Sequence, residues 1–160
     1  MSWESRINQG SPRIMPFITY LLLWSIFAQV ILTFTVLIKM RFVRMRAFKE
    51  AGVTMDEIAV NHNAWPDSVR KVQNNYINQF ELPVLFYLAC VMVFVFSVES
   101  WIFVVLAWLF VASRVVHMLV HTGKNRVKHR FRAFLFGFFC VMFQWIYIMF
   151  IATNAYLYSN

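Results

Sequence analysis

Four long apolar segments constrain the fold of this chain more than any other feature. They cover about residues 15–38, 82–98, 101–120 and 134–157, and Arg114 is the one charged residue inside them. A membrane-spanning helix needs about 20 predominantly apolar residues, and its backbone groups must be hydrogen-bonded within the segment. Transmembrane β-strands would instead alternate polar and apolar residues over about 10 positions, and no such alternation occurs. We therefore predict an all-α membrane protein, a bundle of four transmembrane helices.

The composition agrees with that prediction. Hydrophobic residues make up 61% of the 160 residues and charged residues only 14%, whereas a soluble domain is roughly half apolar and about a quarter charged. The length suits one domain. We expect a single four-helix membrane domain over residues 1–160, with helices at about 15–48, 67–98, 101–121 and 131–157.

The first apolar segment and the two cysteines each allow a second interpretation. The segment is too long for the core of a signal peptide and is followed by Lys39 and Arg41 rather than by a small-residue cleavage site, so we expect a retained anchor. Cys90 and Cys140 both lie inside apolar segments. We therefore expect two buried thiols rather than a disulfide.

The basic residues predict an orientation. Twelve lysines and arginines fall in the connectors 39–71 and 124–132, against two, Arg6 and Arg13, before the first helix. By the positive-inside rule both connectors are cytoplasmic and both termini lie on the other side of the membrane. The net charge of +8 then reflects topology and attraction to anionic headgroups. No nucleic-acid-binding motif surrounds these residues, so we expect no nucleic acid partner.

Local signals divide the first connector. We expect Gly52 to end the first helix. Thr54 and Glu57 have the spacing of a capping box and predict a short helix. The loop NHNAWP (61–66) follows, and Asp67 or Ser68 should cap a second helix that continues to about residue 98, kinked or loosened by Pro83.

A polar stripe marks the start of the second helix. At 100° per residue, four side chains lie within about 80° of one another: Arg70, Asn74, Asn78 and Glu81. The stripe has two interpretations. It is either the solvated face of a helical extension into the cytoplasm or one wall of a polar site, and the second is favoured for the two residues that already lie in the apolar run.

The third helix carries Arg114, His117 and His121 within about 60° of one another. An arginine inside a membrane helix must face the bundle and be paired. Glu81 lies about 24–27 Å from the short turn between the second and third helices and Arg114 about 20 Å. We therefore predict a Glu81–Arg114 ion pair, the alternative being that Arg114 snorkels to the headgroups. The histidines have the i, i+4 spacing of a metal pair but lack a third ligand, so we predict polar lining or headgroup contacts and no metal.

The connector after the third helix adds Arg126, Arg130 and Arg132 at the same end of the bundle. The positive-inside rule alone accounts for most such clusters. Their convergence with Arg114 and with the polar stripe predicts a pocket for a small anion that also bears amide and amine groups.

Two stretches carry a family resemblance. They are FELPVLFYLA and ASRVVHMLVHTGKNRVKHRFR, and within the second the pattern R-V-x-H-x-x-x-x-x-G-K-x-R-x-x-x-R begins at Arg114 and ends at Arg130. They resemble the membrane-associated proteins in eicosanoid and glutathione metabolism, which include the microsomal glutathione transferases and prostaglandin E synthase. The resemblance covers about residues 15–155, and the chain looks like a bacterial-type member.

The resemblance implies a homotrimer of four-helix subunits that binds glutathione as co-substrate near the cytosolic face, between neighbouring subunits. Arg130 matches an arginine linked to thiolate activation, and Arg114 belongs to the same polar cluster, so we take both as catalytic candidates. Asn78 and Glu81 match the family's N-x-x-E. With these, the expected glutathione- or anion-binding set is Arg70, Asn74, Asn78, Glu81, His117, His121 and Arg126. The expected location is a bacterial inner membrane.

Three positions depart from the family pattern. Asn74 stands where the prostaglandin synthase type has an arginine, which Arg70 one turn earlier could replace. His121 stands in place of a common tyrosine, and Phe131 in place of a serine near the thiol.

Three functional hypotheses follow. The first is a glutathione-dependent transferase or peroxidase acting on lipophilic electrophiles from the bilayer. The second is a protein of the same fold that holds a lipid or another anionic ligand without glutathione chemistry. The third, an ion-coupled transporter, is disfavoured because the sequence shows neither repeats nor broken helices.

Overall fold

The structure is a computed structural model that describes residues 15–50, 52–61 and 64–159. Its helices are α2 (Phe17–Glu50), α3 (Met55–Val60), α4 (Asp67–Ile77), α5 (Leu82–Val95), α6 (Trp101–Thr122) and α7 (Val127–Ser159). Four helical segments are long and apolar enough to cross a membrane, with α4 and α5 together forming one of them. The predicted all-α fold of four spans is therefore confirmed. Arg6, Arg13 and part of the 61–66 loop, on which two expectations rested, lie outside the described residues.

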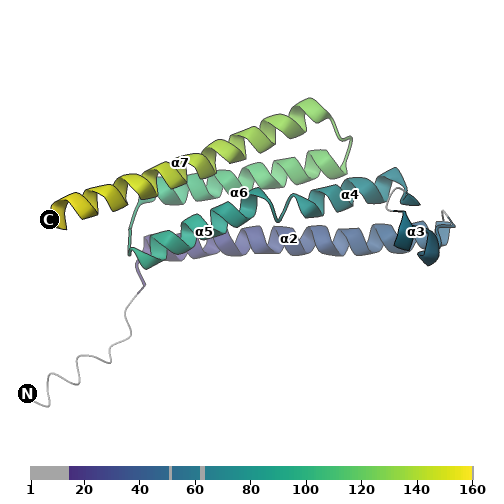
Figure 1. The fold of residues 1–160 in the computed structure, drawn as a ribbon, viewed down its shortest axis with the longest axis horizontal. Coiled ribbons are helices and arrows are strands. Elements are labelled where there is room, and N and C mark those ends of the chain that lie inside the picture. Colours follow the sequence, from purple (N-terminus) through teal and green to yellow (C-terminus); the bar gives the residue numbers. More distant parts are fainter. Residues whose placement is uncertain (1–14, 51, 62–63, 160) are drawn as a thin grey trace, which may run out of the picture.

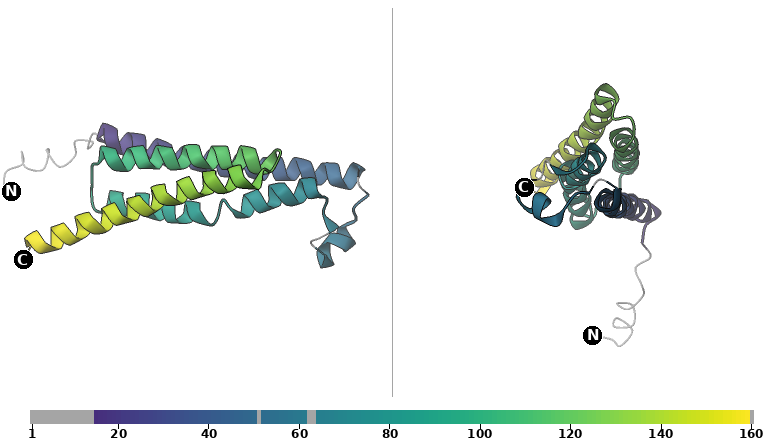
Figure 2. Two further views of the ribbon diagram at one scale, coloured as in Figure 1. Left: turned by 90° about the horizontal axis from the view of Figure 1, so that it is seen from above. Right: turned by 90° about the vertical axis from the view of Figure 1, so that its right-hand side faces the viewer.

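The long helices lie side by side in an up-and-down bundle (Figure 1). The start of α2, the α5–α6 turn and the end of α7 lie at one end of the bundle. The α2–α4 connection and the α6–α7 turn lie at the other end, where α3 projects away from the bundle (Figure 2). The two basic connectors thus share one end of the molecule, which is the arrangement that the proposed orientation requires.

The core is built mainly between α5, α6 and α7. Phe86 of α5 and Phe110 of α6 are fully buried and stack with ring centroids 4.6 Å apart. Ala89 and Ala107 are also fully buried. Such small side chains let membrane helices approach closely, because packing rather than water exclusion drives their association.

Gly137 brings α7 close to α6. A Cβ atom at this position would lie 2.5 Å from the Ser113 hydroxyl oxygen. The close approach matters for function because the next two turns of α7 toward its N-terminus carry Arg130 and Phe134.

The first connector largely follows its sequence signals. Thr54 and Glu57 form the predicted capping box at the start of α3. Gly52, two residues beyond α2, has a φ of 63°, the left-handed conformation that favours glycine at a helix end. The expected cap of the next helix is wrong, because Pro66 holds the N-cap position and Asp67 is the first helical residue. The extended backbone of Pro66 lets its carbonyl accept the first helical hydrogen bonds, from Val69 and Arg70.

The second helix was predicted to run from residue 67 to 98, kinked or loosened at Pro83. The structure instead breaks it before Pro83, so the expected absence of broken helices, one of the two grounds for disfavouring a transporter, is also wrong. The helix ends at Ile77 and resumes at Leu82. Pro83 has no N–H to donate to the carbonyl four residues earlier, and its ring would collide with that carbonyl. The intervening backbone turns instead, and the N–H of Phe80 donates to Ile77 at 2.9 Å. Irregular backbone at membrane depth is tolerated where protein buries it or where it lines a cavity, so the break directs attention to its surroundings.

The predicted buried thiols are confirmed. Cys90 and Cys140 are both buried and neither forms a disulfide.

Candidate functional site

Arg114 holds the break between α4 and α5. Its side chain is fully buried, and its Nη2 donates to the backbone carbonyl of Asn78 at 2.9 Å. Asn78 is the C-cap of α4, where carbonyl groups lack helical partners and a cation is favoured by the helix dipole. The Nε and Nη1 atoms of Arg114 have no hydrogen-bond partner among the described residues. The arginine therefore caps the C-terminal end of α4 by donating to a carbonyl there, and its side chain does not snorkel to the membrane surface.

The predicted Glu81–Arg114 ion pair is wrong as a direct contact, although the Glu81 carboxylate still attracts the Arg114 guanidinium at a longer distance. Among the described residues the ion pairs are Arg46–Glu50 and Arg70–Asp67, and neither involves these two side chains. The prediction placed Glu81 on a continuous helix. The break instead leaves Glu81 exposed at the N-cap of α5, and a backbone carbonyl takes the position in front of Arg114.

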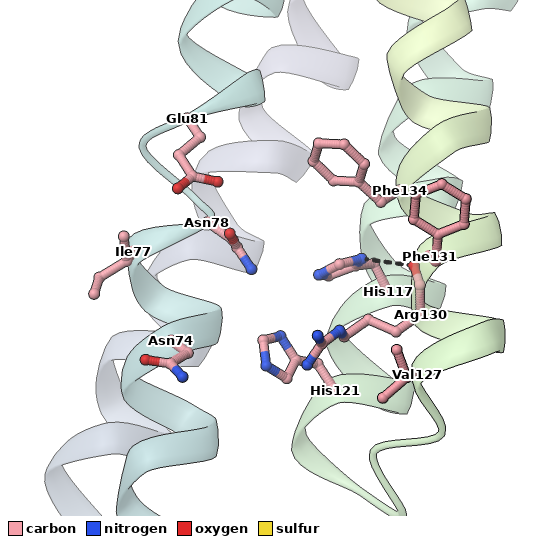
Figure 3. Close-up of a pocket in the computed structure, with 10 residues that line it drawn as sticks. All are labelled: Asn74, Ile77, Asn78, Glu81, His117, His121, Val127, Arg130, Phe131 and Phe134. Atoms are coloured by element: carbon pink, nitrogen blue, oxygen red, sulfur yellow. Dashed lines mark hydrogen bonds between the residues drawn. The ribbon is translucent and has the colours of Figure 1, made fainter. Parts of the chain in front are cut away.

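A cavity of about 470 Å³ lies between the helix break and the facing helices α6 and α7 (Figure 3). His117 and His121 project into it from α6, and the Arg130 side chain extends from α7 toward the two imidazole rings. The opposite wall carries amides and one carboxylate, while the α7 side adds apolar surface. The lining residues are Asn74, Ile77, Asn78, Glu81, His117, His121, Val127, Arg130, Phe131 and Phe134.

The turn between α6 and α7 positions Arg130. Its Nη1 donates to the side-chain oxygen of Asn125 at 2.9 Å. Asn125 has a φ of 49°, a conformation in which asparagine is enriched among non-glycine residues. The backbone carbonyl of Arg130 also lies 3.2 Å from Nδ1 of His117. The arginine is thus tied to the turn by its guanidinium and to α6 by its backbone.

A second cavity of about 210 Å³ shares Asn74, His121 and Arg130 with the first. It adds Arg70, which forms an ion pair with Asp67 at 3.4 Å. Both side chains of this pair are largely exposed, so the pair contributes little stability. Arg70 therefore lies at the outer rim of the site, where its guanidinium can exchange Asp67 for an incoming anion.

The structure brings together most of the residues that the sequence singled out. Six of them line the larger cavity: Asn74, Asn78, Glu81, His117, His121 and Arg130. Arg70 lines the smaller one. Arg114 lies behind the wall at the helix break, and Arg126 is exposed and lines neither cavity.

Sequence reasoning missed two groups of residues. The first is the apolar lining, Ile77, Val127 and Phe134, which gives no signal in a chain where most residues are apolar. The second is a set of buried amides, Gln29, Asn75 and Gln79. Gln29 lies inside the first apolar segment, and this position is the signal that could have drawn attention to it, because a buried polar side chain needs a partner.

Fold and site together define a four-helix membrane protein with a cationic and amide-lined cavity at the end of the bundle that carries the basic connectors. Residues 21–150 match the model of the MAPEG family. The match spans well over half of the chain, so the protein belongs to the MAPEG family, and the resemblance seen in the sequence is confirmed. Members of this family typically use glutathione. No curated protein and no solved structure matches the chain.

Proposed function

We propose that the chain is a membrane glutathione-dependent transferase or peroxidase that acts on lipophilic electrophiles. The observation that carries the proposal is the Arg130 guanidinium, which reaches into a cavity whose other polar lining consists of amides, imidazoles and one carboxylate. A cation close to a thiol favours the thiolate, the reactive nucleophile. Arg130 is accordingly the residue to which we assign thiolate stabilisation.

The rest of the cavity suits the remainder of glutathione. Arginine binds carboxylates through paired hydrogen bonds, and Arg70 at the rim is available for one of the two glutathione carboxylates. Glu81 on the opposite wall complements the ammonium group, and Asn74 and Asn78 offer donors and acceptors for the peptide bonds. Arg114 acts indirectly, because it holds the helix end from which Asn78 enters the cavity.

The apolar part of the lining supports the second substrate class. Phe131 and Phe134 of α7 stand beside Arg130 in the same cavity. An apolar electrophile held against these rings would lie close to the thiolate, and this proximity is itself a source of rate acceleration. We propose that such substrates enter from the bilayer, with the basic connectors cytoplasmic and the subunits assembled as a homotrimer.

Calorimetric titration of the purified protein with glutathione tests the proposal. Arg130→Ala should weaken binding by about 10- to 100-fold, the range expected for loss of a charge-assisted hydrogen bond. Arg132→Ala is the matched control, because Arg132 is exposed and lines neither cavity. Equal loss in the two variants would show a general charge effect, and absence of binding to the wild-type protein would reject the function.

One observation favours a second candidate function. Phe131 is 60% exposed and occupies the position at which related synthases carry a serine near the thiol. An acyl chain would lie against this ring as readily as an electrophile, so the same cavity suits an anionic lipid held without chemistry. Two results together would establish this alternative. The wild-type protein would bind no glutathione, and phospholipid would copurify with the wild-type protein but not with Arg130→Ala.

A further inference from the structure

A chain of buried side chains connects α2 to the cavity through the helix break. It consists of Gln29, Gln79, Asn75 and His121, which are between 0% and 3% exposed. Nε2 of Gln29 donates to Oε1 of Gln79 at 3.0 Å. Nε2 of Gln79 lies 3.4 Å from the backbone carbonyl of Asn75 and 3.5 Å from its Oδ1. Nδ2 of Asn75 lies 3.4 Å from Nδ1 of His121.

The backbone carbonyl of Asn75 determines which atom donates and which accepts in each of these hydrogen bonds. The carbonyl of Asn75 can only accept, so the group that faces it must be the Nε2 donor of Gln79. Oε1 of Gln79 is then left to accept from Gln29, and the second hydrogen of Gln79 Nε2 faces Oδ1 of Asn75. The Nδ2 donor of Asn75 remains for His121. An amide nitrogen donates only, so Nδ1 of His121 carries a lone pair and Nε2 carries the hydrogen.

His117 is held in the opposite tautomer. Its Nδ1 faces the backbone carbonyl of Arg130 at 3.2 Å, and because that oxygen only accepts, Nδ1 carries the hydrogen. The rings of His117 and His121 are nearly perpendicular, with centroids 5.5 Å apart. Nε2 of His117 is buried without a partner among the described residues. His121 lines both cavities and is therefore the histidine whose free N–H is available to a ligand.

We propose that His121 is a neutral N–H donor to the anionic sulfur that Arg130 holds, and that Asn75 and Gln79 are positioning residues that set its tautomer. The identity of the anion rests on the proposed glutathione function, but the tautomer does not. A neutral donor adds a hydrogen bond without adding a third positive charge near Arg114 and Arg130. Glu81, on the facing wall, is the carboxylate that lines the same cavity.

Nitrogen NMR of the ¹⁵N-histidine-labelled protein tests the tautomer without any ligand. The wild-type spectrum should show His121 with a protonated Nε2 and an unprotonated Nδ1, and His117 with the reverse, assigned by the signals lost in His121→Phe and His117→Gln. Asn75→Asp replaces the Nδ2 donor by an acceptor of the same shape. Nδ1 of His121 should therefore change from unprotonated in the wild-type protein to protonated in this variant. A protonated Nδ1 in the wild-type protein overturns the proposal, even if Asn75→Asp does not fold.

Glutathione titration tests the donor role. His121→Gln keeps a donor, because its oxygen can accept from Asn75 while its amide nitrogen faces the cavity, and should retain most of the affinity. His121→Phe keeps a ring but no donor and should lose about 10-fold or more. Equal affinities in the two variants overturn the donor role. If the wild-type protein binds no glutathione while NMR shows the expected tautomers, the proposed function fails and the hydrogen-bonded chain that sets the tautomer stands.

Discussion

Gly137→Ala is the substitution whose effect follows most directly from the structure. The new Cβ would lie 2.5 Å from the Ser113 hydroxyl oxygen and 3.6 Å from both the Ser113 Cβ and a ring carbon of Phe110. The hydroxyl donates to the Phe110 carbonyl at 2.6 Å, so it cannot turn away without losing that bond. Either the hydroxyl rotates or α7 moves from α6, and overpacking of this kind costs about 1–3 kcal/mol.

Ser113→Ala should rescue the glycine substitution. Removing the hydroxyl leaves the two 3.6 Å contacts, which are ordinary van der Waals distances. Thermal unfolding in detergent should show a lower Tm for Gly137→Ala, by about 2–4 °C per kcal/mol. The double variant should recover most of that loss, giving a coupling free energy of about 1–3 kcal/mol. A double variant no more stable than Gly137→Ala alone would refute the packing argument.

Three further predictions concern the break and the buried thiols. Glu81→Gln should change the free energy of unfolding by less than about 0.5 kcal/mol, because Glu81 is exposed and makes no direct ion pair with Arg114. A loss of several kcal/mol on thermal unfolding would show that the two side chains do form an ion pair. Pro83→Ala supplies the missing N–H and should slow hydrogen exchange between α4 and α5, whereas unchanged exchange would place the cause of the break elsewhere. Cys90 and Cys140, 0% and 4% exposed, should react with a maleimide only after denaturation, and rapid labelling of the folded protein would contradict their burial.

The membrane fold could be predicted because the hydrophobicity of each span is summed over about 20 residues. Each span contains a long, predominantly apolar run, and no single residue decides it. The capping box of Thr54 and Glu57 was predictable for a related reason, since both partners lie within one turn and need nothing from the rest of the chain.

The helix break could not be predicted with the same force. Pro83 after an amide-rich stretch is compatible with a kinked helix and with a new helix that begins one residue earlier. The choice between a kinked helix and a new helix depends on whether the carbonyl groups freed by the break find a hydrogen-bond donor. That donor is Arg114, which lies on another helix. The ion-pair prediction failed at the same point, because it considered only carboxylates as partners for Arg114 and not the carbonyl of Asn78.

Most residues that line the candidate site could be predicted, but the buried hydrogen-bond partners behind them could not. The stripe that carries Asn74, Asn78 and Glu81 was argued from a helical period that the break interrupts, yet these residues still line one wall. Gln29 inside an apolar segment signals that a buried partner exists, but the sequence does not say which residue that partner is. That partner, 50 residues away along the chain, is set by tertiary packing.

The most direct test of the central claim is the ultraviolet absorbance of a glutathione thiolate on the purified protein. The wild-type protein and Arg132→Ala should develop this absorbance as glutathione is added at neutral pH, and Arg130→Ala should not. No thiolate signal at saturating glutathione, or an undiminished signal in Arg130→Ala, would contradict the assignment of Arg130 and of the cavity it enters.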